Sequence, residues 1–160
     1  MNRSVSFLAA ILMMAVTVSS ACLAASVENI RFSLEPSAKV RGQVQMSVSS
    51  GTDRRNDNIS SSFRAADLTG LDHGRLASSG PIAFALIREA GRLDCTGEPR
   101  GSRADGTCRF TANAAFANLL ASRRMARPTG QEAYGLTMVG ATRELLDALH
   151  AAGYPMPAVE

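Results

Sequence analysis

The sequence predicts an α+β domain, in which a small antiparallel sheet of four to five strands is followed by about three short helices packed on it. Between residues 27 and 110, apolar and polar residues alternate in short segments, which is the period of a half-buried strand. After Phe110 the apolar spacing becomes helical, and capping residues precede each apolar segment. Strands followed by helices along the chain favour helices segregated to one side of an antiparallel sheet, here 30–110 covered by 112–152.

The first two strands are predicted by alternation. VENIRFSLEP (27–36) and VRGQVQMSVSS (40–50) each place apolar side chains on one face. EPSAK between them offers Pro36 and Ser37 for a turn, so the strands are expected to pair antiparallel. The predicted inward-facing residues are Ile30, Phe32, Leu34, Val44, Met46 and Val48.

The stretch 50–62 is polar and rich in turn-forming residues, which predicts a flexible exposed loop, with ISSSF (59–63) able to regain a strand at its end. PIAFALIREAG (81–91) has few polar residues before Arg88, so we expect a central strand covered on both faces. Ala90 and Gly91 then turn the chain.

RLDCTG (92–97) and GTCRFT (106–111) are two short strands of a predicted hairpin, with Cys95 and Cys108 on one face. Neither cysteine has a second ligand at the close spacing of zinc sites, and no C-x-x-C occurs. A structural disulfide therefore explains the pair best, and free thiols or a metal site are the alternatives. On the loop-entropy relation, so short a closed loop contributes about 3 kcal/mol of stability.

Three helical segments follow. TANAAFANLLASRR (111–124) can be capped by Thr111 or Asn113. PTGQEAYGLTMVG (128–140) begins with Thr129 and Glu132 at the spacing of a capping box. ATRELLDALHAAGYP (141–155) carries three leucines on one predicted stripe and ends at Gly153. The stripe comprises Leu145, Leu146 and Leu149.

The N-terminus has the layout of a secretory signal peptide: Arg3, an apolar stretch over 6–18, and then small residues. Cleavage after Ala24 leaves one exported domain, 25–160. Lipidation at Cys22 and a retained membrane anchor are the alternatives. Cleavage removes Cys22 and lipidation blocks its thiol, so in both of these cases Cys95 and Cys108 remain as an even pair in an oxidising compartment. We expect a periplasmic or secreted protein, bound to a membrane only if Cys22 is lipidated.

Charge argues against nucleic acid as the partner. Beyond residue 24 the chain has sixteen basic and fourteen acidic residues, a net charge of +2. The basic residues are spread out, and two Tyr and no Trp leave few side chains for stacking on bases.

Catalytic signals are weak. Asp72 beside His73 suggests a triad, but no G-x-S-x-G accompanies them, and a solvated loop is the alternative. The spacing of the carboxylates is that of solvated surface rather than of an acid–base pair. No catalytic residue, metal site or cofactor is expected. The carboxylates considered are Glu98, Asp105, Glu144 and Asp147.

Arg100 and Arg103 flank Gly101-Ser102 in the loop closed by the predicted disulfide. A rigid, exposed, cationic loop can bind an acidic partner, a polyanion or an anionic membrane surface. A second group, Arg123, Arg124 and Arg127, complements the dipole at the end of the first helix.

From Phe84 to Pro155 the chain resembles a segment of uncharacterised exported bacterial proteins, which also occurs beside membrane sensor-peptidase domains. An apolar strand, an R-[DE]-A-G turn, a Gly-rich hairpin, F-x-x-N and helices ending in A-G-Y carry the resemblance. It implies no catalytic residues, and relatives commonly have aromatic residues or histidine in place of the two cysteines. The matching positions are Arg88-Glu89-Ala90-Gly91, Gly97, Gly106, Phe110, Asn113, Phe116 and Gly153-Tyr154.

The sequence favours a non-catalytic envelope or periplasmic module that binds a protein or an envelope component. A small periplasmic hydrolase is the alternative. A sensor or inhibitor partner of an envelope protease is a further alternative, by analogy with the neighbours of the related segment.

Overall fold

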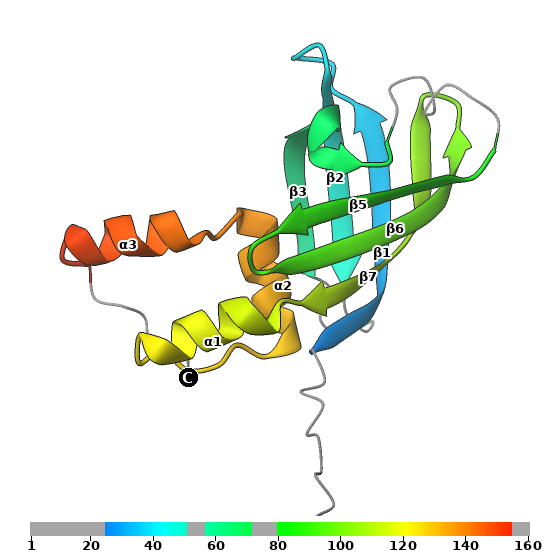
Figure 1. Ribbon diagram of the computed structural model, residues 1–160. Helices are drawn as coiled ribbons and strands as arrows, with labels where there is room; N and C mark the ends of the chain where they lie inside the picture. The colour runs from blue at the N-terminus through cyan, green and yellow to red at the C-terminus, as the bar shows by residue number, and fades with distance from the viewer. Residues whose placement is uncertain (1–24, 51–56, 72–79, 155–160) are drawn as a thin grey trace, which may run out of the picture.

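A computed structural model describes residues 25–50, 57–71 and 80–154, which form a curled antiparallel sheet of seven strands and three helices (Figure 1). The prediction of an α+β fold is confirmed, but the predicted four to five strands were too few. A single 3₁₀ turn, Ala65–Asp67, joins the third and fourth strands. The strands are β1 (Ser26–Pro36), β2 (Gln43–Ser50), β3 (Asp57–Arg64), β4 (Leu68–Thr69), β5 (Ile82–Arg88), β6 (Gly91–Arg100) and β7 (Arg103–Ala112). The helices are α1 (Ala114–Ser122), α2 (Gly130–Val139) and α3 (Arg143–Ala151).

The sheet joins two meanders, because its strand order is β3-β2-β1-β7-β6-β5-β4. β1 pairs with β2 as predicted, with Phe32 opposite Val48 and Leu34 opposite Met46. Its other edge pairs with β7, and the register shifts between Val27 and Ile30. The six inward-facing residues predicted on β1 and β2 are all buried.

One expectation about the strands was wrong and another was only partly right. The stretch 50–62, predicted as a loop, contains most of β3, which pairs with β2 from Asp57 to Arg64 and includes the strand that ISSSF (59–63) predicted. Its serines resemble turn residues in composition, but Ile59 and Phe63 keep the strand period. β5 is not covered on both faces, because the Ile87 side chain is 52% exposed. Nor is it central in the sheet, since its outer neighbour is the two-residue edge strand β4.

The sheet curls until strands far apart in its order meet. The Arg88 guanidinium on β5 lies over the Phe63 ring of β3, 5.5 Å from its centroid. In Figure 1, β5 crosses in front of β2 and β3. The inward residues of both meanders therefore share one core.

Two glycines, Gly97 and Gly106, face each other on β6 and β7 and make room for the core. A Cβ at Gly97 would lie 2.8 Å from Cζ of Phe32, and one at Gly106 would lie 2.7 Å from its Cε1. The Phe32 ring covers this bare pair and meets Phe84 edge-on, with centroids 5.2 Å apart. An aromatic ring over paired glycines is a recurrent way to stabilise a bent sheet.

Helix α2 contacts strands β1, β6 and β7. Ala133, Tyr134 and Met138 belong to the same core as the inward side chains of the sheet, and Tyr134 packs edge-on against Phe110. The predicted capping box is confirmed, because the Thr129 side chain and the Glu132 carboxylate each bind the other residue's backbone N–H. These contacts fix where α2 begins.

Helices α1 and α3 belong to a second apolar cluster rather than to the sheet core, so only α2 matches the expected packing on the sheet. Asn113, not Thr111, caps α1, and Gly153 follows α3 with φ +74°. Of the three leucines predicted on one stripe of α3, Leu146 is buried, whereas Leu145 is 46% exposed. The cluster comprises Ala90, Phe116, Leu120, Ala141 and Leu146, with Leu119, Met125 and Leu136 partly buried against it.

Candidate binding surface

The hairpin of β6 and β7 is joined covalently at its centre. Cys95 and Cys108 occupy directly opposite positions, with an S–S distance of 2.02 Å and Cα atoms 4.0 Å apart. Both residues are buried in the sheet core. The predicted disulfide is confirmed, and such a bond is compatible with export to an oxidising compartment. In the described part of the chain, no group of three potential metal ligands occurs.

The tip of this hairpin carries Arg100 and Arg103 directly opposite each other, and both are exposed. Gly101 between them has φ +69°, a left-handed conformation that glycine adopts at little cost. The Arg103 guanidinium lies 3.0 Å from the Asp105 carboxylate. Four residue pairs separate the Arg100/Arg103 pair from the disulfide, so the tip extends from a covalently closed ladder.

Two rows of polar residues cross the outer face of the sheet beside the tip, and together they are called the hydroxyl rows below. They follow from the pairing register of β7, β1, β2 and β3, in which residues opposite each other point to the same side. The first row is Thr107, Arg31, Ser49 and Asn58, and the second is Asp105, Ser33, Ser47 and Ser60.

Six of the eight residues of the hydroxyl rows, all except Thr107 and Ser60, line a shallow open cavity of about 330 Å³. Phe32 and Val48 contribute to its floor, but their side chains are buried on the other face. The side chains that reach the cavity therefore end in hydroxyl, amide or charged groups, while carbon atoms make up most of its exposed lining. Its polar lining comprises Arg31, Ser33, Ser47, Ser49, Asn58, Arg103 and Asp105.

Arg31 forms no ion pair within the described ranges, and neither does Arg100 at the tip, whereas three other arginines of β6 and β7 each bind a carboxylate. Arg92 binds Asp94 at 2.7 Å, Arg103 binds Asp105 at 3.0 Å, and Arg109 binds Glu28 at 2.9 Å. Within the described ranges, Arg31 has no carboxylate partner, and its opposite neighbours are Ser49 and Thr107. The cavity thus holds one guanidinium that no acidic residue neutralises.

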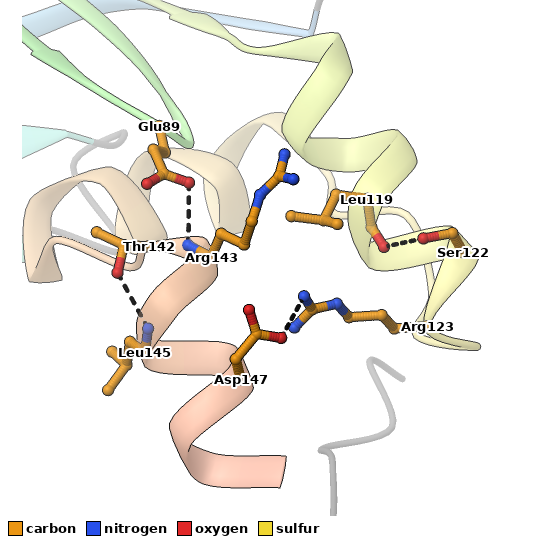
Figure 2. A network of polar contacts seen from close by, with 8 residues as sticks. All are labelled: Glu89, Leu119, Ser122, Arg123, Thr142, Arg143, Leu145 and Asp147. Carbon is orange, nitrogen blue, oxygen red and sulfur yellow. Dashed lines mark hydrogen bonds and ion pairs between the residues drawn. The ribbon is translucent and has the colours of Figure 1, made fainter. Parts of the chain in front are cut away.

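A second depression, of about 350 Å³, lies between α1 and α3, with Glu89, Asn113 and Arg143 among its lining residues. Glu89 accepts hydrogen bonds from residues at the N-terminal ends of both helices. Its Oε2 accepts a hydrogen bond from the Arg143 backbone N–H at 2.9 Å, and its backbone carbonyl accepts one from Asn113 Nδ2 at 2.9 Å. Figure 2 shows the first of these bonds. These contacts give Glu89 a structural role.

Three further positions among those that carry the predicted resemblance, Arg88, Ala90 and Gly91, also serve architecture. Arg88 occupies the space that a Cβ at Gly140 would need, and a Cβ at Gly91 would overlap the Phe110 ring. Ala90 is buried, and its carbonyl accepts a hydrogen bond from the Asn113 backbone N–H at 3.0 Å. The R-E-A-G turn is therefore the point at which sheet and helices join.

The predicted carboxylates do not assemble around a shared cavity. Glu98 and Asp105 stand opposite each other on the hairpin, but Asp105 is bound to Arg103. Glu144 is exposed on α3, and Asp147 is bound 2.6 Å from Arg123 (Figure 2). Asp72 and His73 lie outside the described residues.

Arg123 is the C-cap residue of α1, the end at which it was expected to complement the helix dipole, and its ion pair with Asp147 also joins α1 to α3. The guanidinium of Arg127 returns to α1 and donates to Asn118 Oδ1 at 2.6 Å. No helix in 25–50, 57–71 or 80–154 has the length and apolar character needed to cross a membrane. Residues 1–24, with the predicted signal peptide and Cys22, lie outside these ranges.

Sequence reasoning missed the hydroxyl rows, because they depend on β3 and on the pairing register. The signal was nevertheless present: NISSSF places Asn58, Ser60 and Ser62 on one face and Ile59, Ser61 and Phe63 on the other. A serine-rich strand resembles a loop in composition. The alternation of its apolar residues with polar ones is what identifies it as a strand.

Comparisons with known proteins give no relative. No family model, no curated protein and no solved structure matches the chain.

Proposed function

We propose that this chain is an exported, non-catalytic binding module of the cell envelope. Its contact surface comprises the Arg100/Arg103 tip and the adjoining hydroxyl rows, and its partner is a protein or an envelope component. The single observation that carries the proposal is a solvent-open cavity, lined by hydroxyl, amide and charged side chains, beside an exposed cationic tip on a covalently closed hairpin. A rigid surface loses little conformational freedom on binding, which favours affinity.

The chemistry of the surface supports binding rather than catalysis. Hydroxyls and guanidiniums donate hydrogen bonds to oxygen-rich ligands. General acid–base catalysis needs a titratable group placed against a reacting atom. Asp105, the carboxylate that lines the cavity, is held in an ion pair with Arg103.

Affinity capture from the envelope fraction of the native host tests this proposal. The bait is the mature disulfide-bonded chain, and the test variant is Arg100→Ala/Arg103→Ala. The matched control is Arg92→Ala/Arg109→Ala, which removes the same charge from the same strands away from the tip. We expect the tip variant to recover about tenfold less partner, equivalent to about 1.4 kcal/mol, and the control to recover a normal amount. Equal recovery by all three baits would remove the tip as the contact surface.

A further inference from the structure

We propose that the hydroxyl rows bind an acidic polysaccharide, in which Arg31 holds a uronic-acid carboxylate and the row side chains hold sugar hydroxyls. This inference rests on the proposed function and names its ligand class. The groups that carry it come from four strands, β7, β1, β2 and β3, brought side by side by the pairing register.

The hydrogen-bonding capacity of the rows is largely available to a ligand. Ser47 and Ser60 share one hydrogen bond, 2.8 Å between their Oγ atoms. Across the described ranges, Ser33, Ser49 and Asn58 make no side-chain hydrogen bond. A hydroxyl donates once and accepts twice, and an amide does both, so these side chains match the hydroxyls of a sugar.

The charge of the cavity selects an anion. Arg103 and Asp105 neutralise each other, whereas Arg31 keeps its full positive charge between two hydroxyl-bearing neighbours. A guanidinium binds a carboxylate through two parallel hydrogen bonds, which gives both strength and orientation. A neutral polysaccharide would leave this group without a counterpart.

The lack of exposed rings argues against the usual neutral-sugar site, where an aromatic side chain stacks on the sugar. Every described aromatic residue of the sheet is buried in the core, and so are Phe116 and Tyr134 on the helices. Tyr154, the exposed aromatic residue in the described ranges, follows α3 and does not line this cavity. A protein interface also typically has large apolar side chains buried at its centre. The cavity floor exposes no such side chain.

The shape suits a polymer rather than an enclosed small molecule. Adjacent strands lie about 4.8 Å apart, so a row of four residues spans roughly 14 Å. The two rows are two residues apart along each strand, roughly 7 Å. Each row ends at β3, the edge strand of the sheet.

Titration of the mature chain with defined oligogalacturonates tests the inference, with neutral dextran and dextran sulfate as comparison polymers. The variants are Arg31→Gln and Ser49→Ala, and the control is Arg92→Gln, which removes one charge outside the rows. We expect binding of the oligogalacturonate, no binding of dextran, an affinity loss of about tenfold or more for Arg31→Gln, and a change under twofold for Arg92→Gln. Because Ser49→Ala removes a hydroxyl without a charge, a loss of severalfold there shows that the row itself is used.

Two outcomes would overturn the inference. One is no measurable binding of oligogalacturonate by a folded wild-type chain. The other is equal losses for Arg31→Gln and Arg92→Gln with dextran sulfate binding as well, which would indicate attraction to any polyanion. Either outcome leaves the capture experiment unaffected, so a failed ligand assignment is distinguishable from a failed binding module.

Discussion

The Glu89 carboxylate accepts a hydrogen bond from the backbone N–H of Arg143, across 54 positions of sequence, at 2.9 Å. The first turn of a helix has N–H groups without intrahelical partners, and an anion there also interacts favourably with the helix dipole. The turn between β5 and β6 thus caps the first turn of α3 together with Thr142, whose Oγ1 accepts a hydrogen bond from the Leu145 backbone N–H.

Replacement of this cap should destabilise the helical end of the molecule. We expect Glu89→Ala to lower the free energy of unfolding by about 1 kcal/mol, measured by urea denaturation. Glu35→Ala is the control, since Glu35 is an exposed carboxylate on β1, away from any helix, and makes no ion pair in the described residues. Equal losses for the two variants would contradict the capping role.

Removal of the disulfide should weaken the fold without changing its topology. We expect Cys95→Ala/Cys108→Ala to lose about 3 kcal/mol, from the loop-entropy relation, measured by chemical denaturation. Because both cysteines are buried, a reductant should cleave the bond only as fast as the hairpin opens. Rapid reduction of the native protein, followed by thiol labelling, would show that the bond is accessible.

Substitution of glycine by alanine should have opposite effects on stability in the bent hairpin and in a helix. At Gly106 an added Cβ would overlap the carbonyl oxygen of Thr96, so Gly106→Ala is expected to cost about 3 kcal/mol. At Gly135, within α2, a Cβ meets nothing within 4 Å, so Gly135→Ala should gain up to about 1 kcal/mol. Thermal melts of the two variants check both signs, and a loss at Gly135 would contradict the described packing of α2.

The capping box makes a defined contribution to acid stability. Hydrogen bonds from the backbone N–H and then the side chain of Thr129 lower the pKa of Glu132 below its ordinary value of 4.5. The folded state therefore binds the proton less readily than the unfolded state, so the stabilisation is complete above pH 4.5 and is lost as the pH falls through the lowered pKa.

Glu132→Gln should accordingly reduce the stability difference between pH 7 and pH 3, measured by denaturation at each pH. The two proteins should converge in stability at the acidic end. A variant that loses the same amount of stability at both pH values would show that the carboxylate acts through shape rather than charge.

Local signals predicted much of this fold. The alternation in β1 and β2, the Thr129/Glu132 box and the facing cysteines were confirmed, because each depends on residues close in sequence or on simple strand pairing. The contact of Arg88 with Phe63 could not be predicted, because it depends on how far the sheet curls. The hydroxyl rows were missed for a different reason. A row across four strands exists only in the paired sheet, and its members depend on the pairing register.

Site-specific photo-crosslinking in the native host tests the central claim most directly, namely that the outer face along the hydroxyl rows is the surface that meets the partner. A photoreactive residue at Ser49 lies within the rows, and one at Ala83 lies exposed on β5, outside the residues that line the cavity. The account predicts a crosslinked adduct from position 49 and none from position 83. An adduct from position 83 alone, with none from position 49, would contradict it.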